Sequence, residues 1–184
     1  MMEGVAANHA EARSVVRGLR EMKLNVRPTV RADATALADL LNEIIAAGGT
    51  TAYETPFTPE AFADVHVDGP GVITSMIAEN EDGGPMGFQI LLASDKLGPG
   101  WGDIGTFARR GSTTRGIGSA LFAATRAAAV AAGLRAINAT IRADNTGGLA
   151  FYARMEFVDY AVARAVPLAD GTPVDRISRR FDLG

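Results

Sequence analysis

A glycine-rich segment between a predicted strand and a predicted helix carries the clearest chemical signal in the sequence. Residues 109–118 read RRGSTTRGIG, and an alanine-rich helical stretch follows them. The first N–H groups of a helix have no partners within the helix and lie at the positive end of its dipole. Gly116 and Gly118 let a bulky anion approach the backbone, and Arg115 adds positive charge. The segment is therefore a candidate phosphate-binding loop.

Two better-known phosphate loops do not fit this segment. Gly111 and Gly116 have the GxxxxG spacing of a nucleotide P-loop, but Ile117 and Gly118 stand where Lys and Ser or Thr are needed. In the dinucleotide pattern GxGxxG, Leu121 occupies the third glycine position. Both mismatches argue against a kinase, an NTPase or a dinucleotide-dependent enzyme. An unrelated binder of nucleotide phosphates stays an alternative.

A second pair of residues with chemical potential lies downstream, at Asn145 and Tyr152. They are seven residues apart, which is two helical turns, so both can face one side of the chain. An amide can hydrogen-bond a peptide-like ligand, and a phenol can donate a proton to a leaving group. On its own, the pair is better explained by a helix cap at Asn145 and a half-buried core aromatic at Tyr152.

Composition excludes several classes of function. The chain has 184 residues, 47% of them hydrophobic and 21% charged, as in an ordinary globular protein of one domain or one domain plus an arm. Its net charge of −3 argues against a general nucleic-acid binder. The absence of cysteine excludes disulfides and thiolate chemistry, and the two distant histidines, His9 and His66, do not suit a multi-histidine metal site.

The segment before residue 24 differs from the rest of the sequence. Residues 1–23 are predicted to be an N-terminal arm, helical in its second half, and residues 24–184 the folded domain. The arm has no apolar signal-peptide core, and no stretch reaches the about 18 apolar residues of a membrane span. We expect a cytoplasmic protein that binds neither a membrane nor nucleic acid.

Hydrophobic periodicity, together with the glycines and prolines that end helices and strands, predicts the elements that position these residues. Strands are expected at residues 24–30, 72–79, 86–93, 102–108, 134–142, 160–166 and 174–181. Helices are expected between Asp33 and Gly48, from Thr58 onwards, and at residues 117–132 and 146–154. Strands alternate with helices in the middle of the chain but pair directly at both ends, which indicates an α/β (α+β) fold with a mixed sheet.

The order of these segments resembles that of the GCN5-related N-acetyltransferases (GNAT). The phosphate-loop pattern of that family is Gln/Arg-x-x-Gly-x-Gly/Ala, and residues 113–118 match it at both glycines but carry Thr113 at the first position. Asn145 and Tyr152 have the family's Asn-x6-Tyr spacing, and Met155-Glu156-Phe157 replaces its usual Leu-Gly-Phe. The resemblance covers everything but the arm.

The resemblance implies a strongly twisted sheet of six or seven strands flanked by about four helices, in which two parallel strands splay apart to admit the pantetheine arm of acetyl-CoA. No metal is implied. Backbone pairing with that arm, amides around the pyrophosphate and one amide side chain near the reacting end would bind the cosubstrate. The cofactor-binding residues implied are Thr106, Phe107, Ala108, Thr113, Thr114, Arg115, Gly116, Ile117, Gly118, Ser119 and Asn145.

The implied reaction is transfer of an acetyl group from acetyl-CoA to a primary amine through direct attack and a tetrahedral intermediate. A backbone N–H near Phe107 or Ala108 would stabilise the oxyanion. Tyr152 would protonate the leaving thiolate. The candidate bases are Asp103, Tyr53 and Glu54; Asp103 is equally well read as a solvated strand end. The glutamate that some members carry five residues before the Asn is absent, because Thr140 stands there.

The segment TTAYETPFTPEAF weakly resembles the branch that acetylates phosphinothricin and other small amino acids. Tyr53, Phe57 and Trp101 would wall the acceptor site, and an arginine such as Arg109 or Arg142 would bind an acceptor carboxylate. Protein N-termini or lysines, polyamines and aminoglycosides are alternative acceptors. A non-catalytic acyl-CoA-binding module is a further alternative, and a homodimer is compatible with the resemblance.

Overall fold

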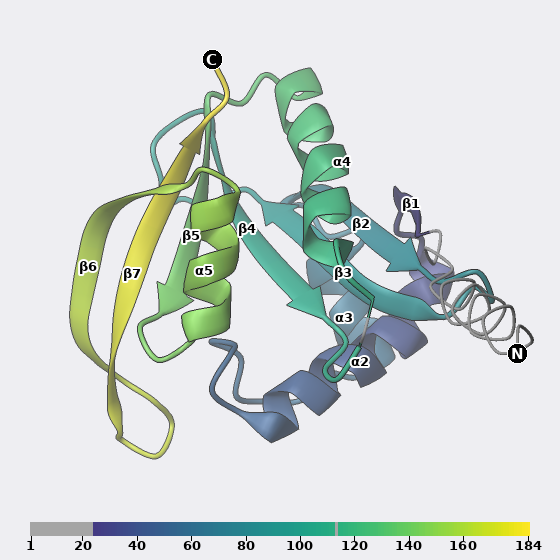
Figure 1. Ribbon diagram of the computed structural model, residues 1–184, viewed down its shortest axis with the longest axis horizontal. Helices are drawn as coiled ribbons and strands as arrows, with labels where there is room; N and C mark the ends of the chain where they lie inside the picture. Colours follow the sequence, from purple (N-terminus) through teal and green to yellow (C-terminus); the bar gives the residue numbers. More distant parts are fainter. Residues whose placement is uncertain (1–23, 113) are drawn as a thin grey trace, which may run out of the picture.

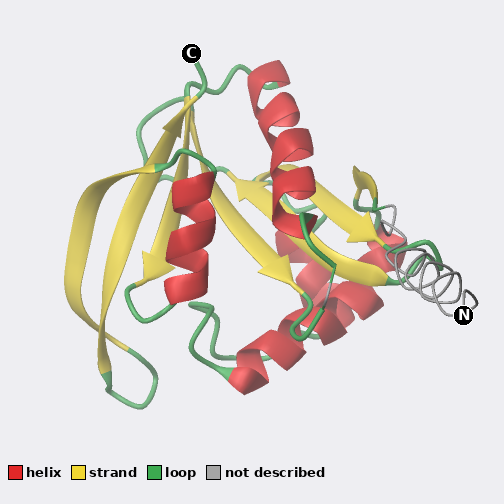
Figure 2. Ribbon diagram, viewed as in Figure 1, coloured by secondary structure: helices red, strands yellow, loops and turns green. Residues whose placement is uncertain are grey.

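The computed structural model describes residues 24–112 and 114–184, so the predicted arm (1–23) and Thr113 lie outside the described residues. Figures 1 and 2 show the arrangement of the elements. The strands are β1 (Asn25–Pro28), β2 (Val72–Glu79), β3 (Pro85–Leu92), β4 (Trp101–Ala108), β5 (Ala136–Arg142), β6 (Val158–Pro167) and β7 (Pro173–Asp182). The helices are a short 3-10 turn η1 (Arg31–Asp33), α2 (Ala34–Ala47), α3 (Pro59–His66), α4 (Ile117–Ala131) and α5 (Thr146–Arg154).

The strands form one mixed sheet, as predicted. Their order is β1-β2-β3-β4-β5-β7-β6. β4 and β5 pair in parallel, while every other neighbouring pair in the described sheet is antiparallel. The α4 crossover between β4 and β5 supplies the long connection that parallel pairing requires.

Side-chain alternation along the strands divides the core between the two faces of the sheet. Phe88 and Phe107 pack with α2 and α3 on one face. Leu91 and Ile104 pack with Phe122 of α4 and with side chains of α5 on the other. Residues of one parity on a strand share a face, so these clusters fix which face every β4 side chain occupies.

The predicted bounds agree with the structure to within two residues, and the largest differences have local causes. β5 begins at Ala136 and not at Leu134, because the N–H of Leu134 donates to the carbonyl of Ala129 at the end of α4. The N–H of Arg135 donates to the carbonyl of Gly100. The predicted starts of α3 and α5 are confirmed, each with its cap: Thr58 Oγ1 accepts from Ala61 N, and the Asn145 side chain accepts from Gly148 N.

The parallel pair β4–β5 is short. The register comprises Trp101 with Ala136, Gly102 with Ile137, and Asp103 with Asn138. Beyond Asp103, β4 continues beside β3, whereas β5 continues beside β7. The two strands diverge in Figure 1, so the backbone edge of β4 from Ile104 to Ala108 is left without a β5 partner.

Candidate functional site

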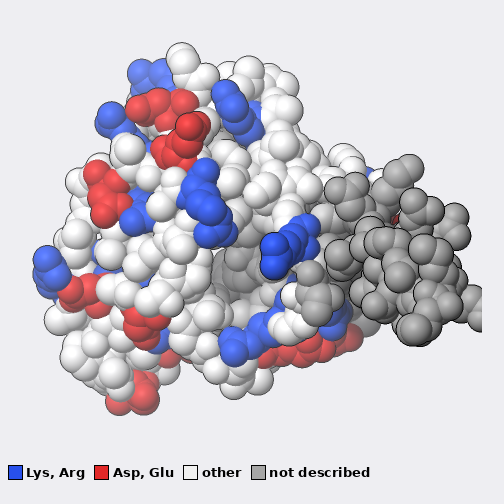
Figure 3. Space-filling view, in the orientation of Figure 1, with Lys and Arg blue, Asp and Glu red and all other residues white. Residues whose placement is uncertain are grey.

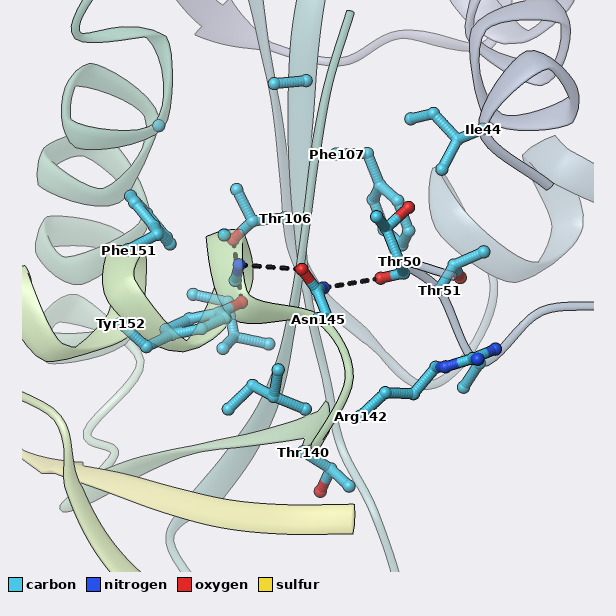
Figure 4. Close-up of a pocket in the computed structure, with 18 of the residues that line it drawn as sticks. Ile44, Thr50, Thr51, Thr106, Phe107, Thr140, Arg142, Asn145, Phe151 and Tyr152 are labelled. Atoms are coloured by element: carbon cyan, nitrogen blue, oxygen red, sulfur yellow. Dashed lines mark hydrogen bonds between the residues drawn. The ribbon is translucent and has the colours of Figure 1, made fainter. Parts of the chain in front are cut away.

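A cavity of about 560 Å³ lies where β4 and β5 diverge. Its walls come from the 50–53 segment, β4, the end of β5, and the first turns of α4 and α5, as the close-up in Figure 4 shows. Nine of the residues singled out as cofactor, catalytic or acceptor residues from the sequence line it: Tyr53, Asp103, Thr106, Phe107, Ala108, Gly118, Arg142, Asn145 and Tyr152. The structure therefore brings together residues from separate segments of the chain.

The free edge of β4 offers backbone donors to this cavity. Arg109 N donates to the carbonyl of Met86 at 2.9 Å, so its N–H points towards β3. In an antiparallel ladder the direction alternates along the strand. The N–H groups of Thr106 and Ala108 therefore face the gap, while that of Phe107 faces β3. Of the two donors suggested by the sequence for an oxyanion, Ala108 has the suitable direction and Phe107 does not.

Asp103 lies at the vertex of the divergence and is held by a hydrogen-bonded chain. Its Oδ1 accepts from Nδ2 of Asn138 at 2.6 Å, and Tyr160 donates its hydroxyl proton to Oδ1 of Asn138 at 2.7 Å. Burial raises the pKa of the Asp103 carboxyl above its usual value, and the Asn138 hydrogen bond opposes this shift. A carboxylate with a raised pKa is a stronger base, so this residue suits proton abstraction near neutral pH.

Tyr152 lies on the opposite face of the sheet from Asp103. Its side chain packs in the same cluster as Ile104, and Asp103 has the other parity on β4. The Tyr152 hydroxyl is 2.9 Å from Oγ1 of Thr106, which also accepts from Nε2 of Gln89 at 2.7 Å. Burial raises the pKa of the Tyr152 phenol, so the hydroxyl stays protonated at neutral pH. A candidate base and a candidate acid thus flank the same gap.

The amino-terminal end of α4 faces the cavity through Gly118. Gly116 caps the helix with φ of +82°, a left-handed conformation that favours glycine. A Cβ on Gly118 would lie 2.6 Å from Cε2 of Phe151, so this glycine is also needed for close packing of α5 against α4. Arg110 lines the cavity and Arg115 is exposed nearby. Figure 3 shows basic side chains around a hollow between α5 and this end of α4.

Other residues of the predicted phosphate loop do not face the cavity with their side chains. Ile117 is buried in a core cluster with Leu121. Ser119 lies on α4 outside the cavity lining, and Thr114 donates its N–H to Oγ of Ser112 at 3.1 Å. Any contribution of these residues to an anion site would therefore come from their backbone N–H groups.

Asn145 lines the cavity, but both ends of its amide are used within the protein. Its Oδ1 accepts from Gly148 N at 2.8 Å, which caps α5, and its Nδ2 donates to the carbonyl of Thr50 at 2.9 Å (Figure 4). The residue fastens the 50–57 loop to the start of α5. A contact with a ligand would have to use the remaining hydrogen-bonding capacity of this amide.

Tyr53 presents its ring to the cavity while its hydroxyl is held in the core. The hydroxyl is hydrogen-bonded to Nε2 of His66 at 2.9 Å, and the ring stacks on Phe107 with centroids 6.1 Å apart. Burial raises the pKa of the Tyr53 phenol, and the nearby Asp103 charge acts in the same direction. Tyr53 therefore suits a wall better than a base, because the phenol stays protonated.

Three of the residues predicted as catalytic or as walls of the acceptor site lie outside the lining of this cavity in the described structure. Glu54 accepts one bifurcated hydrogen bond from Ala169 N, with its two carboxylate oxygens at 2.9 and 3.1 Å, and so ties the loop to the β6–β7 turn. Phe57 packs on Tyr53, with its backbone held by Asn42. Trp101 packs against Tyr160 at the closed end of the β4–β5 pair.

The two arginines considered for binding an acceptor carboxylate differ in their position relative to the cavity. Arg109 donates to the carbonyl of Pro85 and pairs with Glu43, away from the cavity lining. Arg142 lines the cavity and pairs with Asp144 through Nε at 2.9 Å and Nη2 at 2.6 Å. Since those two bonds leave out Nη1, Arg142 can contact a further anion.

Sequence reasoning missed Gln89 and Asn138, which organise the two titratable groups. Each is a fully or almost fully buried polar residue in an otherwise largely apolar strand. A buried amide usually has a hydrogen-bonding partner, so an amide residue within the strand segments PMGFQILL and AINATIR was the available signal.

Two classes of feature are not found among the described residues. No group of three or more His, Cys, Asp or Glu side chains there is arranged to hold a metal ion. No helix in the same part of the chain has the length and apolar character to cross a membrane.

Comparison with known proteins gives one family and one fold. Residues 37–157 match the sequence profile of the Acetyltransferase (GNAT) family. A comparison with curated protein sequences finds no match.

Solved structures share the fold at low sequence identity. The phosphinothricin acetyltransferase from Sinorhizobium meliloti, solved in complex with acetyl-CoA, is 21% identical with a TM-score of 0.78, covering 89% of this chain and 90% of its own. An N-acetyltransferase from Staphylococcus aureus Mu50 is 17% identical with a TM-score of 0.73, covering 88% and 99%. The ribosomal-protein-alanine N-acetyltransferase from Brucella melitensis is 18% identical with a TM-score of 0.72, covering 86% and 99%.

Proposed function

Because the chain belongs to the GNAT family of acetyltransferases, we propose that it transfers an acetyl group from acetyl-CoA to the primary amine of a small molecule in the cavity between β4 and β5. The observation that carries this proposal is the divergence of the two parallel strands after Asp103 and Asn138. It leaves a backbone edge, a candidate base and a candidate acid around one space.

Acetyl-CoA fits the groups that surround this space. The outward N–H groups of Thr106 and Ala108 can pair with the amides of a pantetheine arm as a neighbouring strand would. The unpaired N–H groups in the first turn of α4 suit a diphosphate, and Arg110 and Arg115 add positive charge. The related acetyltransferase from Sinorhizobium meliloti was solved with the same cosubstrate.

The chain supplies a base and an acid for the transfer. Asp103 takes a proton from the acceptor ammonium, because only the neutral amine can attack the thioester carbonyl. A gap-facing backbone N–H of β4 that does not pair with the pantetheine arm donates to the oxygen that gains negative charge; one such donor is typically worth about 3–4 kcal/mol of barrier. Tyr152 gives its proton to the leaving sulfur. The reaction needs no metal.

An amino acid or a close analogue is the acceptor that the charged groups favour. Within the described lining, Asp103 can bind or deprotonate an amine, and Arg142 has a nitrogen free for a carboxylate. The ring of Tyr53 supplies an apolar wall. The weak resemblance of residues 50–62 to the phosphinothricin branch agrees with this acceptor class.

A thiol-release assay with an amine panel tests the proposal. The panel contains free amino acids, their carboxamides, a polyamine and a peptide with a free N-terminal alanine. We expect turnover of amino acids with kcat/KM about tenfold above that of their carboxamides, since the amide lacks the charge that Arg142 binds. Turnover of the peptide or the polyamine alone would contradict the acceptor class. Acetyl-CoA binding without turnover of any amine would indicate a binding module.

A further inference from the structure

A chain of three side chains crosses β3 and β4 and ends at Tyr152. Gln89 and Thr106 are directly opposite each other in the β3–β4 register. Nε2 of Gln89 donates to Oγ1 of Thr106 at 2.7 Å, and that oxygen is 2.9 Å from the Tyr152 hydroxyl. Gln89 is fully buried, and Tyr152 is 6% exposed.

The chemistry of these groups fixes which one donates in each of the two hydrogen bonds. An amide nitrogen is only a donor, so Thr106 cannot give its proton to Nε2 of Gln89. The acceptor that the described contacts leave for the Thr106 proton is the oxygen of Tyr152. When Thr106 donates to that oxygen, the phenolic proton of Tyr152 is free to point into the cavity.

The burial of Gln89 supports a role beyond packing. Its Oε1 is buried without a hydrogen-bond partner among the described residues. A buried carbonyl of this kind is costly, and an apolar residue would avoid the cost. The strand around it is otherwise apolar, so the one contact that the amide does make, to Thr106, accounts for its presence.

We propose that Gln89 and Thr106 are positioning residues that turn the hydroxyl proton of Tyr152 towards the leaving sulfur of acetyl-CoA. The inference rests on the proposed function. In the step, the C–S bond of the thioester breaks as the tetrahedral adduct collapses, and the O–H proton of Tyr152 passes to sulfur to form the S–H bond. Thr106 keeps its proton and hydrogen-bonds the resulting phenolate, which regains a proton from solvent after release of CoA.

A double-mutant cycle between Thr106 and Tyr152 tests this arrangement. Thr106→Val removes the hydroxyl with little change in volume, and Thr106→Ser restores it. We expect Thr106→Val to lower kcat about tenfold, within the range of general-acid catalysis, while the Kd of acetyl-CoA measured by calorimetry changes less than about twofold. Thr106→Ser should recover most of the lost kcat. In a Tyr152→Phe background, Thr106→Val should have no further effect.

Two further variants complete the design. Gln89→Met keeps the side-chain length and removes the donor, so it should also lower kcat. If Gln89→Met does not fold, the Thr106 variants still test the proposal. Thr125→Val is the matched control, since Thr125 is fully buried on α4, its hydroxyl has no partner in the described structure, and it lies outside the cavity lining. Its kcat should match that of the wild type.

The outcomes separate this inference from the proposed function. The positioning role would be overturned if Thr106→Val lowered kcat equally in the wild-type and Tyr152→Phe backgrounds, or if it did not lower kcat in the wild-type background. Tyr152→Phe with an unchanged kcat would remove the acid assignment itself. Failure of the wild type to bind acetyl-CoA in calorimetry would instead refute the cosubstrate site.

Discussion

Asp103 and Asn138 form the last pair in the parallel register of β4 and β5, and their side chains are hydrogen-bonded at 2.6 Å. The pair therefore has both a backbone role and a side-chain role. Its backbone marks the point where the strands separate, and its side chains hold a carboxylate at the vertex of the cavity that the separation creates. The position of the proposed base is a consequence of the sheet topology.

Replacement of this carboxylate tests its catalytic role. Asp103→Asn removes the proposed base, so we expect kcat/KM at pH 7 to fall by about 10²-fold or more. Burial raises the pKa of Asp103 above its usual value of 3.8, so the wild-type kcat/KM should fall as the pH drops through this raised pKa. Asp103→Asn should lose this acidic limb. Asp95→Asn, the same change at an exposed position, is the control; an equal loss there would contradict the assignment.

The close contact of Gly118 with Phe151 predicts a specific effect of an added methyl group. Gly118→Ala puts a Cβ 2.6 Å from the Phe151 ring, which must move and which also lines the cavity. We expect a loss of about 1–3 kcal/mol in the free energy of unfolding, and weaker acetyl-CoA binding in calorimetry.

Gly111→Ala is the matched control for this contact. Gly111 has φ of +69°, and no atom lies within 4 Å of the place that a Cβ would take, so alanine there adds backbone strain without a clash. It should cost stability and leave binding close to that of the wild type. If Gly118→Ala bound acetyl-CoA as well as Gly111→Ala, the packing of α5 on α4 would not shape the cosubstrate site.

His66 predicts a pH dependence of stability. It is fully buried against Tyr53, and burial lowers its pKa from 6.5 to about 4. Between these pH values the unfolded chain binds a proton that the folded chain does not, so the free energy of unfolding decreases as the pH falls from 6.5 to about 4. Urea unfolding from about pH 7 to about pH 4.5 measures this, and His66→Gln should show a flatter dependence. Identical slopes for both proteins would contradict the buried neutral state.

Arg142 predicts a substrate-dependent effect. Lysine cannot reproduce the planar pairing of Arg142 with Asp144 while keeping a nitrogen for a ligand. Arg142→Lys should raise KM for an amino-acid acceptor about tenfold, which corresponds to about 1.4 kcal/mol, and change KM for the carboxamide much less. An equal rise for both acceptors would show that Arg142 acts on the fold of the site and not on the carboxylate.

The elements of the fold could be predicted from the sequence because local signals determine them. Thr58-Pro59 at the start of α3, Gly133 after α4 and the turn at Asp170 each act over a few residues. The divergence of β4 and β5 is different: it depends on pairings between distant segments, and it was expected only from the resemblance to a family.

The candidate site was predictable in its backbone parts and less so in its side chains. Trp101 is an aromatic residue on the correct strand, but it lies where β4 and β5 are still paired. Glu54 is in the correct loop, but its carboxylate is directed to Ala169 N. Strand register and loop anchoring decide which way such residues point, and neither leaves a local pattern in the sequence. For the same reason the contact of Gln89 with Thr106 could not be predicted.

A crystal structure of the protein with acetyl-CoA is the decisive test of the proposed cosubstrate site between β4 and β5. We expect the pantetheine arm to lie along Thr106–Ala108 in the gap between β4 and β5, with the diphosphate at the first turn of α4 and the thioester sulfur within reach of the Tyr152 hydroxyl. Binding of acetyl-CoA at another place, with the gap closed by the protein's own side chains, would contradict the account.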